Sequence, residues 1–463
     1  MKSGDESIES QLALHLATLR YEDISDVAIT ATEALLLDTV AAMVASLRSS
    51  ECIGLRDRWA AEEGGLGKCS LIGNEHKVSA GSAAFLNGVF AHWYEWDDVH
   101  IPSILHASAV LFPVLLAAAE SRTLLGEKVS GQEFISTCVA TFDVAARISE
   151  CIVPKMHNGW MPTGNAVIGA AGGAARLLGL GADGVHSAMG IAAATMGVSR
   201  QPIKDKVNGK NVLCGIVAQS AMHAAYLAKQ GISGSRGFLF GPFGAATLFA
   251  DGSGSEEAAL SGLRDHFSIT ESSVKLYPCC QSTHGCIDAA LDLHSKEQDL
   301  VNKIENIELR LPQRNYELVG GQFQLGENPR VAAQFSVAFT VALALHRGAV
   351  RIDDFSDTSV RNAREVINLT ERTQISINDE PGHLVRLHLR DGSIRERSTT
   401  IYKGNPRLPL NDHDRNMKLN DALAIVHPAN QSAQLASMVN QVNLQGIDPL
   451  MRWVRELNVA STV

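Results

Sequence analysis

A run of small and apolar residues in the first quarter of the chain leads into a short polar segment. Residues 83–119 read AAFLNGVFAHWYEWDDVHIPSILHASAVLFPVLLAAA. The first part of this stretch is apolar on nearly every face, which predicts a buried helix. Pro102 ends any helix that reaches it, and a second apolar helix is predicted after His106. The polar segment therefore lies between two buried helices.

Three acids follow the first of these helices directly: Glu95, Asp97 and Asp98. At a helix C-terminus they oppose the macrodipole, which favours cations there. This field and the mutual repulsion of the acids should raise the pKa of at least one carboxyl group. Two interpretations stay open. The segment is either an active-site loop that also holds His100 and His106, or a solvated loop whose acids cap the next helix.

The rest of residues 1–269 has mostly helical periodicity. Residues 65–82 are typical of turns with a short extended piece, and residues 231–274 are rich in loops. Two of the predicted helices, Asn165–Leu178 and Asp183–Thr195, have faces of Gly and Ala. Because Gly destabilises a helix by roughly 0.5–1 kcal/mol relative to Ala, we expect these faces to pack closely against the backbones of neighbouring helices. The predicted helices are two within residues 7–48, the second being the buried Thr30–Arg48, then Val129–Glu150, Asn165–Leu178, Asp183–Thr195 and Val212–Lys229.

The pattern changes after residue 270. Residues 304–312 alternate as a strand does, and residues 385–400 predict a hairpin that turns at Asp391-Gly392. The tail returns to helical periodicity. The predicted helices are Val331–His346 and Thr358–Ile367, then Asn420–Val426 and Ser432–Val439 in the tail. The fold predicted is mainly α, with a helical domain formed by residues 1–269 and 405–463 and an inserted α/β domain formed by residues 270–404.

Composition narrows the class of protein. A chain of 463 residues is too long for one ordinary core, and its net charge of -10 argues against a nucleic-acid surface. The acidic, polar first residues resemble neither a signal peptide nor a transit peptide. The uncharged stretch 159–175 contains Pro162 and is shorter than a typical membrane span. We therefore expect a soluble, cytoplasmic protein without a membrane partner.

The eight cysteines are expected to be reduced. No pair has C-x-x-C spacing, and Cys279, Cys280, His284 and Cys286 are too crowded for a tetrahedral zinc site. The cysteine framework of an iron–sulfur cluster and the glycine-rich motifs of nucleotide sites are also missing. The sequence therefore predicts no metal and no cofactor, and side chains must supply the chemistry.

Lysines precede the helix predicted from Val212. Lys204, Lys206 and Lys210 would add to the positive end of that helix dipole and favour an anion such as a carboxylate. The alternative, solvated surface lysines, suits Lys204 and Lys206 better than Lys210, because Lys210 is followed by the apolar segment NVLCGIVA.

The change of pattern near residue 270 is marked by VKLYPCCQSTHGCIDAALDL. Lys275, Tyr277, Cys279, Cys280 and His284 precede a helix at what would be a domain junction, where clefts commonly open. Buried packing is the alternative for His284 and for the two cysteines. The candidates for chemistry are then Glu95, Asp97, Asp98, His106, Lys210 and Lys275. Lysines bind carboxylates, and an imidazole, a lysine or a carboxyl group can move a proton at carbon, so this set suits dehydration, decarboxylation or epimerisation.

The chain resembles the MmgE/PrpD family, which includes 2-methylcitrate dehydratase, cis-aconitate decarboxylase and iminodisuccinate epimerase. The resemblance covers nearly the whole chain. It implies an all-helical domain built from both chain ends, an inserted α/β lid, a homodimer and no cofactor. It rests on LLLDTVAAMVAS, AAFLNGVFAHWYEWDDVH, LHASAVLFPVLLAAAE, NGWMPTGNAVIGAAGGAARLLGL and KLYPCCQSTHGCIDA.

The resemblance also assigns roles to residues. It implies catalytic positions at His106, Lys210, Lys275, Glu95 and, as a weak match, Tyr316. The positions predicted to contact substrate are Asp98, Met161, His157, Gln281 and His284. Two of these depart from the family, because Met161 stands where a histidine is usual and Gln281 where an arginine is usual. Methionine cannot donate a proton, so three functions stay open: a lyase on a citrate- or aconitate-like acid, an epimerase, and a family member that binds without turnover.

Overall fold

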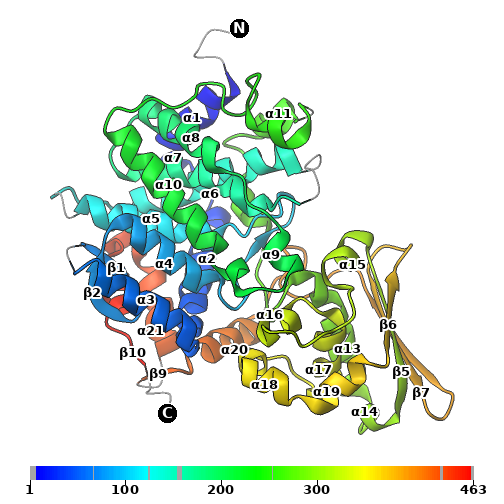
Figure 1. Cartoon of the computed structure of the whole chain (residues 1–463). Coiled ribbons are helices and arrows are strands. Elements are labelled where there is room, and N and C mark those ends of the chain that lie inside the picture. The colour runs from blue at the N-terminus through cyan, green and yellow to red at the C-terminus, as the bar shows by residue number, and fades with distance from the viewer. Residues whose placement is uncertain are drawn as a thin grey trace.

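The structure, a computed structural model, describes residues 7–65, 67–123, 126–153, 159–252, 254–427 and 431–459. Helices dominate it, as predicted, and the sheets are small. The first half of the chain forms a helical body (Figure 1). Its longer helices are α1 (Ile8–Thr18), α2 (Asp26–Ala45), α3 (Ser50–Glu62), α4 (Ala80–His92), α5 (Ser108–Thr123), α6 (Gly131–Ile152), α7 (Ala166–Leu177), α8 (Ala182–Ala192) and α10 (Leu213–Lys229).

Helix α4 lies at the centre of this body, and all thirteen of its residues are buried. It packs against α5 and α10. Glycines allow the close approach: a Cβ atom at Gly215 of α10 would overlap the carbonyl oxygen of Phe85 in α4. The expected packing of glycine-rich helices is also confirmed, because a Cβ atom at Gly169 of α7 would lie 2.9 Å from the backbone nitrogen of Ala145 in α6.

The second half of the chain carries the four-stranded sheet at the lower right of Figure 1, in the order β6-β5-β7-β8. Strand β5 (Ile304–Leu311) runs parallel to β6 (Thr373–Ile377) and antiparallel to β7 (His383–Leu389), which pairs with β8 (Ile394–Thr399). The predicted strand and the hairpin at Asp391-Gly392 are confirmed. The helices of this half are α13 (His284–Lys296), α14 (Leu300–Lys303), α15 (Gln313–Val319), α16 (Pro329–Gln334), α17 (Val337–Arg347), α18 (Asp357–Asn362) and α19 (Arg364–Thr370).

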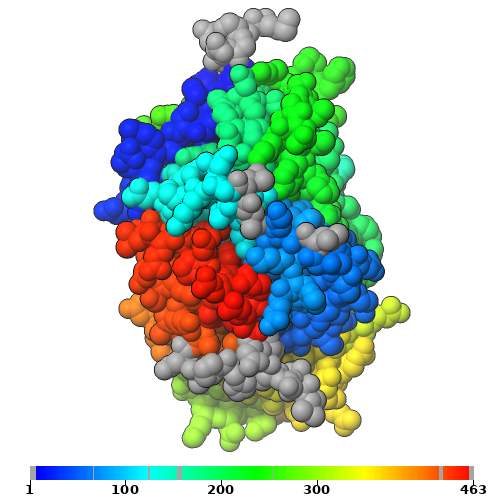
Figure 2. Space-filling view, turned by 90° about the vertical axis from the view of Figure 1, so that its left-hand side faces the viewer, coloured from blue at the N-terminus to red at the C-terminus, as the bar shows by residue number. Residues whose placement is uncertain are grey.

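The tail returns to the helical body. Figure 2 shows it, in red, beside segments from the first third of the chain, in blue and cyan. Arg48, just after α2, donates to the carbonyl oxygens of Asp421 and Ala422. Lys418 forms a buried ion pair with Asp38 of α2 at 2.5 Å. The elements of the tail are α20 (Asp412–Leu423), β9 (Val426–His427), α21 (Gln431–Asn440), α22 (Val442–Gln445), α23 (Asp448–Arg455) and β10 (Asn458–Val459).

Buried apolar side chains form two clusters. One joins residues between 8 and 269 with Ile352 and with residues between 419 and 454, and the other lies between residues 276 and 410. The loops expected between residues 231 and 274 contain short elements, and two short strands precede α4. These elements are β1 (Cys69–Leu71), β2 (Asn74–Val78), α11 (Ala245–Ala250), α12 (Glu256–Leu260) and β4 (Ser272–Ser273), and a further short helix, α9 (Gln201–Lys204), precedes α10.

One segment of the described chain, Asp26–Arg48, is long and apolar enough to cross a membrane by length and composition alone. It is not the stretch 159–175 that the sequence argument considered. More than half of its most apolar window is buried inside the protein.

Candidate active site

The segment between α4 and α5 is buried and locally strained. Glu95 has φ 56° and Ile104 has φ 58°, although neither is glycine. The left-handed region is unfavourable for a β-branched residue such as Ile104, and such strain concentrates at functional sites. Strand β3 (Val99–His100), inside this segment, pairs with β4. The interpretation of this segment as a solvated loop, which the sequence left open, is therefore wrong.

Side chains from distant segments hold four consecutive carbonyl oxygens at the end of α4. These oxygens have no partner within the helix, and buried carbonyls need one. Their donors come from four distant segments, which therefore meet at this loop: the segment before α10, α16, the segment before α13, and α20. Asn211 and Arg330 donate to Trp93, Gln334 to Tyr94, Lys275 to Glu95, and Lys418 to Trp96, over 2.6 to 3.0 Å.

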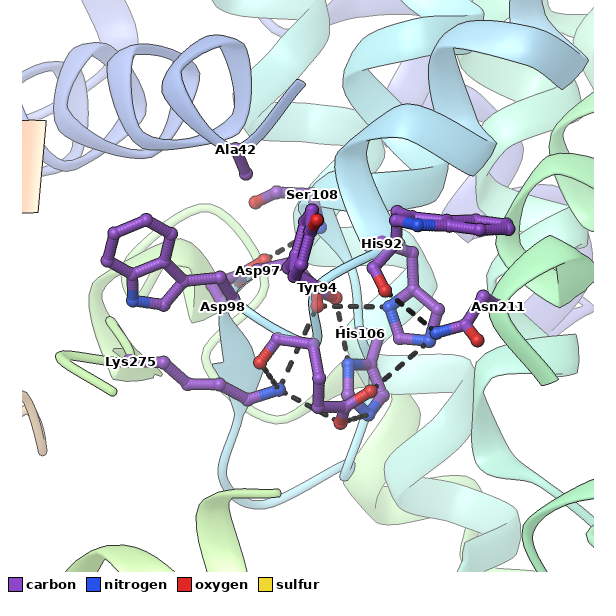
Figure 3. Close-up of polar contacts among 12 residues, drawn as sticks. Ala42, His92, Tyr94, Asp97, Asp98, His106, Ser108, Asn211 and Lys275 are labelled. Atoms are coloured by element: carbon purple, nitrogen blue, oxygen red, sulfur yellow. Dashed lines mark hydrogen bonds and ion pairs between the residues drawn. The ribbon is translucent and has the colours of Figure 1, made fainter. Parts of the chain in front are cut away.

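Asp97 accepts hydrogen bonds from two imidazoles. Its Oδ1 lies 3.0 Å from Nδ1 of His92, and its Oδ2 lies 2.8 Å from Nδ1 of His106. The two rings meet edge to face with centroids 4.8 Å apart. In Figure 3, dashed lines join Asp97 to both rings, and the side chain of Lys275 points toward the same group. Asp97 thus orients both histidines through their Nδ1 atoms.

Glu95 lies between two lysines. Its Oε2 contacts Nζ of Lys210, and its Oε1 lies 3.0 Å from Nζ of Lys275. Lys210 also lies 2.8 Å from Nε2 of His92, and Nε2 of His106 lies 3.8 Å from Oε1 of Glu95. Both lysines are fully buried, whereas the His106 side chain keeps 14% of its surface exposed. Only His106 of this group therefore reaches solvent directly.

Burial and charge set the protonation of this group. Burial lowers the pKa of His92 to about 3, which keeps the ring neutral. Burial alone would raise the pKa of Asp97, but the hydrogen-bonded imidazoles of His92 and His106 and the charge of Lys275 hold it well below its ordinary value. Burial, reinforced by the charge of Lys275, lowers the pKa of Lys210 well below that of a free lysine. The Glu95 carboxylate acts on Lys210 in the opposite direction.

Asp98 has a different role. Its Oδ1 accepts from the backbone N–H of Ser108, the first residue of α5, and its Oδ2 accepts from the hydroxyl of Ser272, each over 3.0 Å. Burial, followed by the charge of Asp97, raises the Asp98 pKa to about 6. The expected raised carboxyl pKa is confirmed at this residue. The expectation that an acid caps the following helix holds for Asp98.

A cavity of about 260 Å³ opens next to these groups. Its wall is mixed, with charged side chains between apolar ones. Thr163 is a further candidate for a substrate contact, because its buried hydroxyl has no hydrogen-bond partner in the described chain. The lining residues are Glu95, Ile104, His106, Val153, Trp160, Met161, Pro162, Thr163, Arg200, Ile203, Lys210, Cys280, Arg314, Glu317, Leu318 and Phe335.

The structure brings some of the predicted residues to this cavity and not others. Glu95, His106, Met161 and Lys210 line it. Lys275 was expected to face the cleft, but it is buried behind Glu95. Its Nζ donates to the carboxylate and to the carbonyl oxygen of Glu95.

The other predicted residues that the structure describes do not line the cavity. Asp98 caps α5. His284 is fully buried beside the rings of Tyr277 and Tyr402, and burial lowers its pKa to about 3. Gln281 and Tyr316 do not line the cavity, and His157 lies outside the described residues. The roles proposed for these residues remain predictions.

Sequence reasoning missed three residues. His92 looked like an ordinary helix residue, and its position three residues before Glu95 was the available signal. Arg200 and Arg314 line the cavity but lie in polar segments that resemble solvated surface. No pattern in the sequence connects these two positions.

Among the described residues, His92, Asp97 and His106 have ligand atoms within 4.8 Å of one another, close enough to hold a metal ion. The surroundings do not suit a dication. Nζ of Lys275 lies 3.8 Å from Oδ1 of Asp97, and Nζ of Lys210 contacts His92. Each imidazole could offer a metal only its Nε2 atom, and Nε2 of His92 already accepts from Lys210. The donor set fits a hydrogen-bonded proton-transfer group better than a metal centre.

The geometry defines a class of site, in which acids, imidazoles and lysines converge on a small cavity. Residues 10–258 match the MmgE/PrpD N-terminal domain, and residues 277–444 match the MmgE/PrpD C-terminal domain. The chain belongs to the MmgE/PrpD family.

Several proteins named cis-aconitate decarboxylase are similar to this chain. The protein from Aspergillus terreus is 28% identical over 352 residues, which cover 71% of each chain. The protein from Mus musculus is 28% identical over 355 residues, or 72% of this chain and 69% of the relative. The protein from Homo sapiens is 25% identical over 352 residues, or 72% of this chain and 70% of the relative.

Proposed function

We propose that this protein is a cofactor-independent lyase that transfers a proton next to a carboxylate of a small citrate- or aconitate-like acid. The observation that carries the proposal is that His106, oriented by Asp97, and Lys210 line one cavity with Glu95. The names of the relatives, which are lyases, support this class of reaction.

The residues have separate tasks in this proposal. Nδ1 of His106 donates to Asp97, so Nε2 is free to take or give a proton on the cavity side. Lys210 binds a substrate carboxylate and can give a proton, since its pKa is lowered. Lys275 keeps Glu95 in place from behind.

Two reactions fit this arrangement. In a decarboxylation, the bond from carbon to one carboxylate breaks, carbon dioxide leaves, and the electron pair passes through a neighbouring double bond to a carbon that takes up a proton. His106 or Lys210 supplies that proton. In a dehydration, one of these groups removes a proton beside a carboxylate, and the hydroxyl group leaves as water after it is protonated.

Epimerisation of the iminodisuccinate type is the second candidate, because the same groups could remove a proton from carbon and return it to the other face. Binding without turnover is the third, and Met161 favours it, since a thioether at the cavity wall cannot carry a proton. The products distinguish these three functions. A lyase releases carbon dioxide or water, an epimerase only inverts the configuration of its substrate, and a binding protein forms no product.

The remaining predictions belong to the same proposal. We propose that residues 270–404 act as a lid on a helical domain formed by residues 1–269 and 405–463. The two apolar clusters support this division. A homodimer in the cytoplasm, without a nucleic-acid or membrane partner, completes the proposal.

The test is incubation of the purified protein with cis-aconitate, 2-methylcitrate and iminodisuccinate, with products followed by proton NMR. Release of carbon dioxide or water from one of the first two acids is the expected result. Inversion of iminodisuccinate alone would favour the epimerase. A rise in melting temperature without any product would favour a binding protein.

A further inference from the structure

His92 contacts the charged groups of the site but does not line the cavity. It is the last residue of α4 and is fully buried. Its Nδ1 lies 3.0 Å from Oδ1 of Asp97, and its Nε2 lies 2.8 Å from Nζ of Lys210. Nε2 also lies 3.6 Å from Oε2 of Glu95. A residue in this place acts on a substrate only through its neighbours.

The contacts of the ring decide where its proton lies. Burial lowers the pKa of His92 to about 3, so the ring is neutral and carries one proton. The Asp97 carboxylate can only accept a hydrogen bond, so this proton is on Nδ1. Nε2 then has a lone pair, and it faces the same Nζ as the carboxylate of Glu95. Both acceptors favour the ammonium form of Lys210 over the neutral amine.

The ammonium group of Lys210 has three N–H donors. One contacts Glu95 and one contacts His92, and no other described residue accepts from Nζ. Nζ lies 4.9 Å from the centre of the Phe335 ring, and both side chains line the cavity. The remaining N–H is therefore free for a substrate carboxylate. A neutral imidazole suits this place, because a further carboxylate there would repel the substrate.

Other groups around Lys210 act against its charge. Burial, followed by the charge of Lys275, lowers its pKa, and Arg330 acts in the same direction. The titratable and charged groups that face Lys210, besides His92, are Glu95, Cys214, Lys275, Cys280 and Arg330. A fully buried lysine beside two other cations needs more than one acceptor to stay protonated.

We propose that His92 is a positioning residue for Lys210. Its Nε2 accepts one N–H of the ammonium group, which keeps Lys210 charged and leaves one N–H for the cavity. This inference rests on the proposed function, in which Lys210 binds a substrate carboxylate, and it adds the residue that prepares the lysine for that task.

Two substitutions separate the two sides of the ring. In His92→Gln the amide oxygen can take the place of Nε2, whereas the shorter amide of His92→Asn reaches only the place of Nδ1. We expect His92→Asn to lower the pKa of Lys210 by about 1 to 2 pH units, the worth of one hydrogen bond to a charged group. His92→Gln should lower it by less than half as much. Nitrogen-15 NMR of Nζ, assigned with Lys210→Arg, measures this pKa without a substrate.

His223→Asn, at an exposed histidine of α10, is the matched control and should leave the pKa of Lys210 unchanged. An unchanged pKa in His92→Asn, or equal losses in His92→Asn and His92→Gln, overturns the proposal, because His92 would then only pack beside Asp97. The wild type gives a test that needs no variant. Nitrogen-15 spectra of its histidines should show His92 neutral with the proton on Nδ1 between pH 5 and 9, and a proton on Nε2 overturns the proposal.

Kinetics extend the test when an acid is processed. The alkaline limb of kcat/KM should move to lower pH in His92→Asn and stay in place in His92→Gln, and an unmoved limb in His92→Asn overturns the positioning role. The NMR measurements do not depend on turnover. A protein that processes none of the tested acids but shows the expected pKa values keeps this inference and loses only the proposed lyase activity.

Discussion

Nε2 of His92 lies 2.8 Å from Nζ of Lys210, and this contact fixes the tautomer of a buried ring. Burial keeps His92 neutral, and its Nδ1 lies 3.0 Å from Oδ1 of Asp97. The proton of the ring is therefore on Nδ1, and Nε2 accepts from Lys210. Since Asp97 also accepts from His106, a continuous chain of hydrogen bonds links Lys210 to His106 through a single carboxylate.

Asp97→Asn should break this chain. An amide offers one acceptor oxygen, so only one of the two Nδ1–H groups of His92 and His106 keeps its partner. A histidine that changes tautomer then carries its proton on Nε2 and cannot act as a base. We expect kcat to fall by about 10²- to 10⁴-fold, the range between loss of a general base and loss of an orienting aspartate. Steady-state rates between pH 5 and 9 measure it. A kcat within threefold of wild type across this range would contradict it.

His106→Gln tests the proton-transfer role directly. Glutamine can still accept and donate hydrogen bonds, but it cannot carry a proton between groups. We expect kcat to fall by about 10²-fold or more, with a much smaller change in KM, because in the proposed function Lys210 binds the substrate carboxylate. His413→Gln, an exposed histidine of α20, is the control. If KM rises while kcat stays unchanged, His106 is a binding group, and proton transfer must be assigned to Lys210, which also lines the cavity.

Lys275→Met should destabilise the protein. Lys275 is fully buried and donates to the carbonyl oxygen and the carboxylate of Glu95. Breaking a buried ion pair by removing one partner costs about 3–5 kcal/mol. We expect the free energy of unfolding in urea to fall by about this amount. Adding Glu95→Gln to Lys275→Met should lower the stability further, because the buried Lys210 then loses its carboxylate partner. Wild-type stability in Lys275→Met would argue against the contact.

The elements around the site could be predicted because the sequence encodes them locally. An apolar residue on nearly every face predicted α4, and the Asp391-Gly392 turn predicted the β7–β8 hairpin. The same acids that oppose the dipole of α4 predicted a polar group between buried helices. Asp98 shows the limit of that argument, since one acid caps a helix while its neighbour binds two imidazoles.

The remainder of the site depends on contacts between distant segments. Lys275 is 180 positions away in the sequence from Glu95, whose carbonyl oxygen it binds. Lys418 is even further in the sequence from Trp96, whose carbonyl oxygen it binds. Periodicity carries no information about such pairs. Arg314 is an exposed residue of a seven-residue helix, so its place at a cavity could not be read from the pattern around it.

Chelation should leave activity unchanged. His92, Asp97 and His106 are close enough to hold a metal ion, but two neighbouring lysine side chains oppose a dication. We expect activity after dialysis against EDTA to equal that of a sample dialysed without it, with metal content followed by mass spectrometry. Loss of activity on chelation, with recovery on adding one metal, would show that the three residues are ligands.

Asp98→Asn should change how stability depends on pH. The pKa of Asp98 is raised to about 6 in the folded protein from an ordinary value of 3.8. A carboxyl group with a raised folded pKa contributes stability that is fully present below about pH 4 and is lost as the pH rises through about 6. This difference in pKa corresponds to about 3 kcal/mol at neutral pH.

Asparagine does not titrate, and its amide oxygen can still accept from the N–H of Ser108 while its NH₂ group donates to the Ser272 hydroxyl. The free energy of unfolding of Asp98→Asn, minus that of the wild type, should therefore rise between pH 4 and pH 7 by about 3 kcal/mol. Urea titrations at four pH values measure this difference, and Asp379→Asn, at an exposed site, should show no such rise. A difference that stays flat or falls with pH would mean that the Asp98 carboxyl group is ionised in the folded protein at a pH near its ordinary pKa. The acid would then be stabilised by its two donors more than it is destabilised by burial and by Asp97.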